Sequence, residues 1–312
     1  MTWGIRQGDV LDRLREMPDA SVQMVATSPP YYGLRDYGHD GQIGLEPSPD
    51  AYVAKLVEVF REVKRVLRDD GTLWLNLGDS YAGSGKGPSH DLKEHRNMSV
   101  TAAAPNRWLS VPAGIKGKDL IGIPWMVAFA LRADGWYLRS DIIWHKPNPT
   151  PESVTDRPTS SHEHVFLFAK SQRYYYDAEA IRESDLGTDH PRSLRKEASL
   201  EPSGGLRSVN GEIRTVDGRN GAGRNKRNVW TIATQPYPEA HFAVWPEALV
   251  LPMVLAGSPA NGVVLDSFCG SGTTLKVAVE RGRHAIGIEL NPDYCKLAEK
   301  RLACVTAPLF AA

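Results

Sequence analysis

The sequence predicts an α/β fold built around a largely parallel sheet. Apolar segments of strand length alternate with segments of helical periodicity along most of the chain, which is the pattern of strand–helix–strand units. Near the end, residues 263–274 have the pattern of a strand, a glycine-rich turn and the start of a helix. With 312 residues, 41% hydrophobic and 24% charged, the chain is long enough to bury a full core.

The individual elements follow from the spacing of the apolar residues. Strands are predicted over residues 21–27, 72–79, 137–146, 162–171, 262–268 and 284–290, and helices over 50–67, 122–135, 245–257, 274–282 and 292–303. The helix over 50–67 has apolar residues at Val53, Leu56, Val57, Phe60, Val63 and Leu67. Gly71 is expected to act as a stop signal after it, and Pro252 to bend or end its own helix.

Two stretches, residues 81–119 and 183–228, break this alternation and are rich in Gly, Ser, Asn and Pro. The second holds nine Lys or Arg residues against seven Asp or Glu, a net charge of +2. Composition alone allows two interpretations, a solvated loop or an arm that closes on a polyanion.

Charge and cysteine content restrict the class of protein. The net charge is zero and the pI is about 7.1, so no bulk basicity indicates a nucleic-acid partner, although a neutral total can hide basic segments. Three cysteines without metal-ligand spacing fit a reduced, intracellular protein. The first residues do not have the pattern of a signal peptide, and no apolar run has the roughly 20 residues that span a bilayer. We therefore expect a cytoplasmic location and no membrane partner.

The glycine-rich turn is a candidate ligand site. Glycines at 270 and 272 would let a ligand approach the backbone, and the helix that follows offers free amide groups to an anion. The next strand ends at Glu289, whose carboxylate can accept hydrogen bonds from ribose hydroxyls, and Asn291 follows where an adenine ring could be bracketed. The spacing is not GxGxxG, so the pattern favours a nucleoside-containing cofactor without a dinucleotide fingerprint. A tight structural turn is the alternative.

The predicted strand over 21–27 ends abruptly at Ser28-Pro29-Pro30-Tyr31. Two prolines cannot donate ladder hydrogen bonds, and they stiffen the chain. This tetrapeptide and the segment Asp266–Thr273 together resemble the catalytic motif and the cofactor loop of S-adenosylmethionine-dependent amino-methyltransferases of DNA. The catalytic motif precedes the cofactor loop, which is the order of the β group of that family. The alternative for the tetrapeptide is a structural strand terminator.

The resemblance implies the fold and the domain organisation. The family has a Rossmann-like fold: a mostly parallel seven-stranded sheet with one antiparallel strand, helices on both faces, and inserted recognition loops. Residues 1–182 would form the catalytic half of the domain, 183–228 a target-recognition insertion, and 229–312 the cofactor-binding half. On this interpretation the arginines of the insertion contact phosphates and base edges.

The resemblance also implies the reaction. Ser28 Oγ and the Pro29 carbonyl would accept hydrogen bonds from an exocyclic amine, Tyr31 would stack on the base with support from Tyr32, and Pro30 completes the motif. The base would be flipped out of the duplex. Serine rather than aspartate in this motif favours N4 of cytosine, and N6 of adenine is the alternative. A nicotinamide-dependent oxidoreductase and a catalytically silent DNA-binding protein are the rival classes.

The remaining implied roles concern the cofactor and the DNA. The residues expected to bind S-adenosylmethionine are Asp9, His241, Phe242, Asp266, Phe268, Cys269, Gly270, Ser271, Gly272, Thr273, Thr274, Glu289 and Asn291. A capping role for Asp9 and core packing for His241 are the alternatives. Lys146, Asn148 and Arg157 would face the nucleic acid.

Neither a metal site nor a covalent mechanism is predicted. His162-Glu163-His164 lacks a third ligand at zinc spacing, and Cys269 lies in the cofactor turn rather than in a Pro-Cys motif. Double-stranded DNA is the implied partner. A homodimer and a cognate restriction endonuclease that acts on the same site stay open.

Overall fold

The structure is a computed structural model that describes residues 2–33, 41–83, 111, 114–183, 208–209, 212–213, 223–235 and 244–305. Its centre is an eight-stranded sheet in the order β1 (Trp3–Gln7), β10 (His284–Glu289), β9 (Val263–Asp266), β2 (Val22–Thr27), β3 (Leu67–Leu77), β5 (His162–Ala169), β4 (Tyr137–His145) and β8 (Val229–Thr231). A separate two-stranded ladder joins β6 (Ser208–Val209) to β7 (Glu212–Ile213). In the large sheet β5 alone runs antiparallel to its neighbours.

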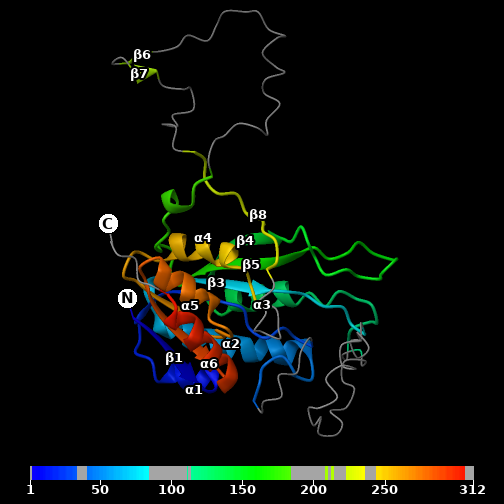
Figure 1. Cartoon of the computed structure of the whole chain (residues 1–312). Helices are drawn as coiled ribbons and strands as arrows, with labels where there is room; N and C mark the ends of the chain where they lie inside the picture. Colours follow the sequence, from blue (N-terminus) through cyan, green and yellow to red (C-terminus); the bar gives the residue numbers. More distant parts are fainter. Residues whose placement is uncertain are drawn as a thin grey trace, which may run out of the picture.

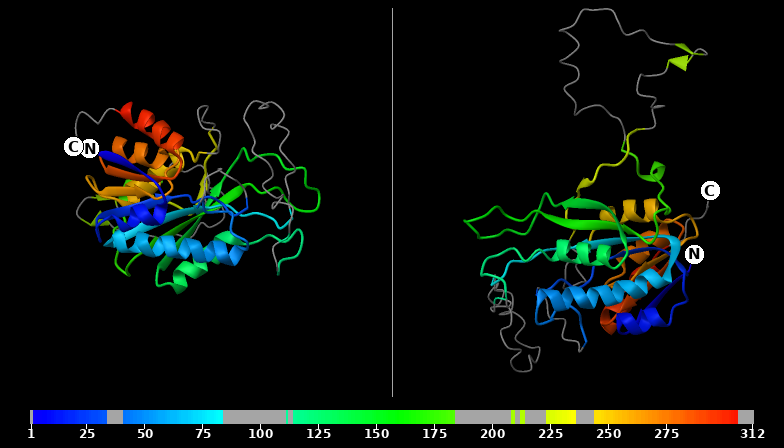
Figure 2. Two further views of the ribbon diagram at one scale, coloured as in Figure 1. Left: turned by 90° about the horizontal axis from the view of Figure 1, so that it is seen from below. Right: turned by 180° about the vertical axis from the view of Figure 1, so that it is seen from behind.

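Helices cover both faces of the sheet (Figures 1 and 2). The helices α1 (Val10–Arg15), α2 (Pro49–Val66) and α3 (Ile123–Ala133) pack on one face, and α4 (Glu247–Gly257), α5 (Thr273–Glu280) and α6 (Pro292–Ala303) pack on the other. A short 3-10 helix, η3 (Glu179–Ile181), lies against α4. Strand β2 shows the division directly, because Val25 belongs to the first core while Met24 and Ala26 belong to the second.

The predicted α/β class, the helices on both faces and the single antiparallel strand are confirmed. The sheet has eight strands rather than seven, because the short strand β8 pairs with the outer side of β4. Strand β1, which has no prediction of its own, pairs with β10, so the first residues of the chain complete the C-terminal half of the sheet.

The prediction for Gly71 is wrong, and of the two outcomes predicted for Pro252, a bend or an end of the helix, the end is wrong. Gly71 does not end a helix: α2 ends at Val66, and Gly71 lies inside β3, where an added Cβ would be 2.8 Å from the Leu67 side chain and 3.0 Å from the Gln23 carbonyl. Helix α4 does not end at Pro252 but continues to Gly257. Met253, Val254 and Ala256 are buried beyond the proline, and their burial offsets the cost of about 3 kcal/mol for an interior proline.

The strand directions bring one edge of the sheet together as a site. The C-terminal ends of β2, β3, β4, β9 and β10 lie at the same edge, since these strands are parallel. Strand β5 is antiparallel, so it contributes its first residues to this edge instead of its last. Loops that follow parallel strands commonly carry binding sites in such sheets. Within the described ranges, no helix combines the length and apolar character needed to cross a membrane.

Candidate active site

Asp266, at the end of β9, ties the two motifs together. Its carboxylate accepts hydrogen bonds from Thr27 Oγ1 at 2.7 Å, from Thr274 Oγ1 at 2.6 Å and from the Phe268 amide at 3.1 Å. It therefore joins the end of β2 to the cofactor turn and to the start of α5. The side chain is 1% exposed, and burial raises its pKa from 3.8 to about 6 in spite of these three donors. The structure places Asp266 behind the turn as a brace.

The raised pKa of Asp266 leads to a prediction about stability. The folded protein keeps a proton on Asp266 that the unfolded chain loses as the pH rises from about 4 to about 6. Protonated Asp266 therefore adds to the free energy of unfolding in full below pH 4, and this contribution is lost as the pH rises to about 6. For a shift of about two pKa units it is on the order of 3 kcal/mol. Asp266→Asn removes the titration and leaves a hydroxyl donor without its acceptor, which costs about 1–3 kcal/mol.

Urea unfolding at pH 4 and pH 7 checks this prediction. The stability difference between the wild type and Asp266→Asn should be larger at pH 4, with Asp12→Asn, at an exposed position on α1, as the matched control. A difference that is the same at both pH values would contradict the assignment.

Glu289, the last residue of β10, holds the loops on both sides of the expected cofactor site. Its Oε2 accepts a hydrogen bond from the Gly270 amide at 2.8 Å, and its Oε1 accepts one from the Asn291 amide at 2.9 Å. A carboxylate can accept about four hydrogen bonds, so these two do not exclude the ribose hydroxyls that the sequence predicts. Glu289 is therefore at the expected place and has a second role, in holding the turn.

The glycine-rich turn has space for a ligand at one position and none at another. Gly270 has a φ of +49°, and no atom lies within 4 Å of the position that a Cβ would take. Gly272 has a φ of +79°, and a Cβ added there would lie 2.9 Å from the Ala298 Cβ of α6. Gly270 thus lines an open cradle, while Gly272 lets α6 pack closely behind the turn. The cradle, the Glu289 carboxylate and the start of α5 fit a nucleoside cofactor with a carboxylate group.

The hydroxyls of the two threonines at the start of α5 make contacts inside the protein. Thr274 donates to Asp266, and Thr273 Oγ1 accepts from Arg301 Nη1 at 2.9 Å. The other turn residues are Ser267, Cys269 and Ser271, all buried, and the partly buried Phe268. The Ser271 hydroxyl lies 3.5 Å from the same Arg301 nitrogen. Binding of the carboxylate at this turn through backbone amides and the threonine hydroxyls stays a prediction.

Two further expected cofactor residues cap helices. Asp9 Oδ1 accepts hydrogen bonds from the Leu11 and Asp12 amides at the start of α1, at 2.9 and 3.2 Å. Asn291 Oδ1 accepts one from the Asp293 amide at the start of α6, at 2.8 Å. A capping side chain can still touch a ligand, so contact of either residue with the cofactor stays a prediction. His241 and Phe242 lie outside the described residues.

The tetrapeptide lies at the edge of the sheet directly after β2. Pro29 is buried, and the Pro30 carbonyl accepts a hydrogen bond from the Tyr52 hydroxyl of α2 at 2.8 Å. Tyr32 packs on Tyr52 with their ring centroids 5.5 Å apart. Ser28 and Tyr31 are only partly buried. The segment is thus anchored through Pro30 and Tyr32, and it keeps Ser28 and Tyr31 at the site.

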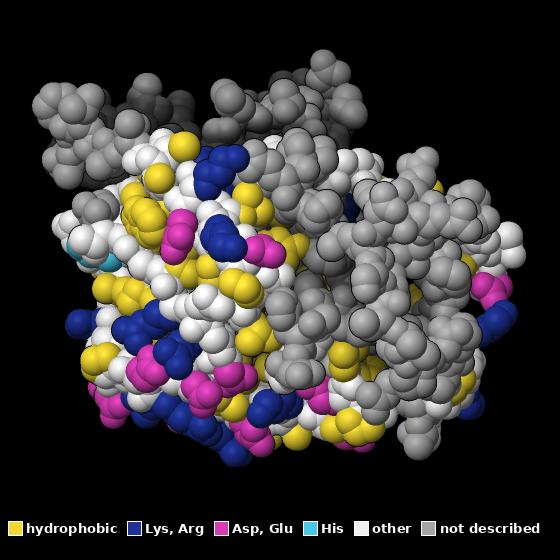
Figure 3. All heavy atoms as spheres, turned by 60° about the horizontal axis from the view of Figure 1, so that its bottom comes forward, with side chains coloured by type: hydrophobic (Ala, Val, Ile, Leu, Met, Phe, Trp, Pro, Cys, Tyr) yellow, Lys and Arg dark blue, Asp and Glu magenta, His cyan; other side chains and the backbone are white. Residues whose placement is uncertain are grey.

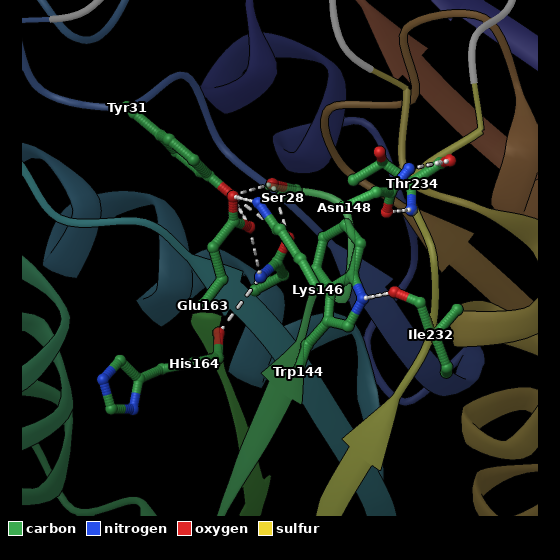
Figure 4. A network of polar contacts seen from close by, with 10 residues as sticks. Ser28, Tyr31, Trp144, Lys146, Asn148, Glu163, His164, Ile232 and Thr234 are labelled. Atoms are coloured by element: carbon green, nitrogen blue, oxygen red, sulfur yellow. Dashed lines mark hydrogen bonds and ion pairs between the residues drawn. The ribbon is translucent and has the colours of Figure 1, made fainter. Parts of the chain in front are cut away.

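Ser28 and Tyr31 belong to a polar network that the sequence did not predict (Figure 4). The Tyr31 hydroxyl lies 2.7 Å from Glu163 Oε2 and 3.1 Å from Asn76 Oδ1. Ser28 Oγ lies 3.4 Å from Asn76 Oδ1 and from the Tyr31 hydroxyl. Lys146 forms an ion pair with Glu163 Oε1. The sequence signal for Glu163 is a carboxylate between two histidines at the start of a strand that is apolar from Val165 onward.

The Tyr31 ring is closely confined. An added Cβ at Gly78, just after β3, would lie 2.5 Å from Tyr31 Cε2, so the ring lies directly against the backbone there. Burial, followed by the nearby negative charge of Glu163, raises the pKa of the Tyr31 hydroxyl well above its usual value. Tyr31 is therefore neutral at physiological pH and acts as a hydrogen-bond donor to Glu163.

The residues expected to face the DNA make contacts within the protein. Lys146 pairs with Glu163, Asn148 exchanges two hydrogen bonds with the backbone of Thr234, and Arg157 pairs with Glu152. The Arg157 guanidinium also lies 3.8 Å from the ring centroid of Tyr81. Asn148 and Arg157 lie in the loop between β4 and β5, which projects to the right in Figure 1. Lys146 points into the site, and contact of Asn148 or Arg157 with DNA stays a prediction.

Most of residues 183–228 lie outside the described residues, but the two ends of this segment are described and meet. Glu183 and Arg224 exchange two backbone hydrogen bonds of 2.9 Å, and the Glu183 carboxylate accepts from Nε of Arg224 and of Arg227, each at 3.0 Å. Lys226 lies 5.1 Å from the ring centroid of Trp230. Arg224 and Arg227 therefore close the base of the segment, which separates them from the arginines expected to read DNA.

The two rejected sites can also be located. His164 Nδ1 lies 2.9 Å from Asp141 Oδ1, and in the described part of the chain no three His, Cys, Asp or Glu side chains gather as a metal site. Cys269 is buried beside Gly287, where an added Cβ would lie 2.7 Å from its Sγ, and burial raises its thiol pKa well above the usual value. The thiol is thus a packing group here.

Comparison with known proteins shows which family the chain resembles. The profile of a family described as DNA methylase matches residues 22–300. The chain is 46% identical to the Type II methyltransferase M.Cfr9I of Citrobacter freundii over 95% of this chain and 86% of that protein. It is 45% identical to the Type II methyltransferase M.SmaI of Serratia marcescens over 95% of this chain and 89% of that protein.

Solved structures show a similar fold. The cytosine-N4-specific PvuII DNA methyltransferase matches with a TM-score of 0.64 at 18% identity, over 98% of this chain and 89% of that one. TTHA0409 of Thermus thermophilus, solved with S-adenosyl-L-methionine, matches with a TM-score of 0.58 at 23% identity, over 97% of this chain and 95% of that one.

Proposed function

The chain belongs to the DNA methylase family, and we propose that it methylates N4 of cytosine within a specific sequence of double-stranded DNA. It is a Type II DNA methyltransferase of the N4/N6 family, and its methyl donor is S-adenosylmethionine. Family membership argues against the nicotinamide-dependent oxidoreductase. A homodimer and a cognate restriction endonuclease stay predictions, the latter motivated by the Type II relatives.

The observation that carries the proposal is the arrangement of polar groups around Ser28. An exocyclic amine is a weak nucleophile because its lone pair is delocalised into the ring, so the site must accept hydrogen bonds from its N–H groups. Ser28 can accept only if its own proton points elsewhere, and Asn76 Oδ1 lies 3.4 Å from Ser28 Oγ to receive it. The lone pairs of Ser28 then face the site, where the Pro29 carbonyl is the second proposed acceptor.

The cofactor and the chain divide the chemistry. Bound S-adenosylmethionine supplies an electrophilic methyl group on its sulfonium. The chain supplies position: Ser28 and Pro29 orient the amine, Tyr31 offers its ring to the flipped base, and Glu289 and the Gly270 cradle hold the nucleoside. Both motifs lie at one edge of the sheet, joined through Asp266 and Thr27.

The preference for cytosine rests on Ser28 and on the N4-specific enzyme of similar fold, so the target base needs a direct test. We expect single-molecule sequencing of DNA from cells that express the protein to show N4-methylcytosine in one sequence context. N6-methyladenine instead would establish the alternative target. DNA without either modification, from cells that contain the folded protein, would contradict the proposed function.

DNA contact is proposed to come mainly from residues 183–228. Figure 3 shows a face on which the described Lys and Arg side chains are interspersed with Asp and Glu. Opposite charges also pair on the exposed sides of α1 and α2, where Arg15 pairs with Asp12 and Lys55 with Glu58. A face of mixed sign does not attract a polyanion strongly, so the described residues of this face do not favour DNA contact, whereas residues 183–228 have a net charge of +2.

Replacing residues 184–222 with a short Gly-Ser linker is expected to leave S-adenosylmethionine binding intact and to remove sequence-specific methylation. The linker can close because Glu183 and Arg224 already meet at the base of the segment. Calorimetry measures cofactor binding, and sequencing of treated DNA measures specificity, with a linker in place of residues 84–110 as the matched control. Retained methylation of the same site would move recognition to residues 33–48 or 81–119.

A further inference from the structure

The first observation is that each of four adjacent strands places at least one polar side chain at the same place on the edge of the sheet. Ser28 and Tyr31 follow β2, Asn76 lies near the end of β3, Glu163 near the start of β5, and Lys146 directly after β4. Glu163 can reach this point only because β5 is antiparallel to both neighbours. It lies at the centre of the network, between the tetrapeptide and Lys146 (Figure 4).

The second observation is that Glu163 fixes the direction of the hydrogen bonds around it. An ionised carboxylate only accepts, so Tyr31 and Asn76 must both donate to Oε2, at 2.7 and 3.1 Å. Asn76 Nδ2 also donates to the His164 carbonyl, at 3.1 Å. With its amide nitrogen between two acceptors, Asn76 must turn Oδ1 toward Ser28, which can donate to it, because the single Tyr31 proton is directed at Glu163.

The third observation concerns Lys146, which holds the carboxylate. Lys146 pairs with Glu163 Oε1, and the two side chains are 18% and 16% exposed. The ammonium also lies 4.4 Å from the ring centroid of Trp144. Trp144 donates to the Ile232 carbonyl at 2.8 Å, so Lys146 rests on a side chain that is itself fixed. The ion pair therefore occupies a well-defined, largely buried position.

We propose that Glu163, held by Lys146, is a positioning residue that sets the polarity of the methylation site by orienting Asn76 and Tyr31. The inference rests on the proposed function, because it explains why Ser28 presents acceptor lone pairs to the amine. It also assigns Lys146 to the ion pair rather than to DNA. If the Asn76 amide turned over, its nitrogen would face Ser28 and would compete with the amine for the same lone pairs.

The test combines Glu163→Gln and Lys146→Met. In Glu163→Gln, either the new amide nitrogen faces the Lys146 ammonium, or it faces Tyr31 and Asn76 and reverses the network. Its kcat should fall on the order of 100-fold, the size expected for a misplaced reacting group. Adding Lys146→Met removes the first conflict, so the glutamine oxygen can take the Oε2 position. The double variant should therefore be about 10-fold more active than Glu163→Gln alone.

Additional measurements separate this role from folding and from DNA contact. S-adenosylmethionine affinity should stay near wild type in all variants, while kcat changes. Thermal unfolding checks that each variant is folded, and Glu163→Gln should melt at a lower temperature than the wild type because it leaves the largely buried Lys146 ammonium without its partner. The matched control pair is Arg61 and Asp134, which join α2 to α3 at 2.6 Å away from the site. Arg61→Met and Asp134→Asn should leave methyl transfer unchanged, singly and together.

Two results would overturn the inference. A double variant no more active than Glu163→Gln, with a reduced salt dependence in Lys146→Met, would make Lys146 a phosphate contact. Glu163→Gln at wild-type kcat would remove Glu163 from the site. The proposed function is judged separately, by methyl transfer in the wild type and its loss in Ser28→Ala. A wild-type protein that methylates no DNA overturns both.

Discussion

Ser28→Ala is expected to lower methyl transfer on the order of 100-fold or more while S-adenosylmethionine binding stays unchanged. The variant removes one proposed acceptor of the amine N–H at the reacting centre, and loss of a comparable group at other reacting centres costs about 10²–10³ in rate. Ser28 lies in the network with Asn76 and Tyr31, whereas the cofactor cradle is built by the turn after β9. Single-turnover kinetics on a DNA substrate measure the chemical step.

The matched control for Ser28→Ala is Ser21→Ala. Ser21 precedes the other end of β2, where its exposed hydroxyl donates to the Pro18 carbonyl at 2.7 Å. That variant should methylate DNA at the wild-type rate. Wild-type turnover by Ser28→Ala would show that the tetrapeptide does not hold the amine. Loss of S-adenosylmethionine affinity in Ser28→Ala would place Ser28 in the cofactor site instead of beside the amine.

Glu289→Ala should abolish most S-adenosylmethionine binding. The proposed interaction is two charge-assisted hydrogen bonds to the ribose, each contributing about 1.5–3 kcal/mol. The variant also removes the acceptor of the Gly270 and Asn291 amides, which donate hydrogen bonds to Glu289 at 2.8 and 2.9 Å. The glycine-rich turn therefore loses contacts that hold it in place. Together these losses predict a decrease in affinity of about 10²–10⁴-fold, which calorimetry can measure.

The control for this prediction is Glu58→Ala, on the exposed side of α2, where Glu58 pairs with Lys55 at 3.3 Å. Its cofactor affinity should equal that of the wild type. Glu289→Gln provides a second comparison, because an amide can keep one of the two acceptors. Unchanged affinity in Glu289→Ala would exclude Glu289 from the cofactor site.

The sequence was sufficient for most of the fold because its elements are defined by local patterns. The predicted helix over 50–67 is α2, Pro49–Val66, and the predicted strand over 21–27 is β2, Val22–Thr27. Apolar periodicity reports which face of an element is buried, and neighbouring residues of one segment carry that information. Local patterns predict neither of the short strands β1 and β8, since their pairing partners β10 and β4 lie far away along the chain.

The sequence by itself also determined the two motifs and their family. The tetrapeptide and the turn are each a continuous segment, so adjacent residues are enough to identify their chemistry. The tertiary structure decided which side chains surround them. The sequence assigns no role to Glu163, and the resemblance predicts that Lys146 faces the DNA. Glu163 contacts Tyr31 and Asn76, and Lys146 pairs with Glu163, because β5 lies antiparallel between β3 and β4. The direction and order of strands depend on hydrogen bonds between distant segments, and no local pattern encodes them.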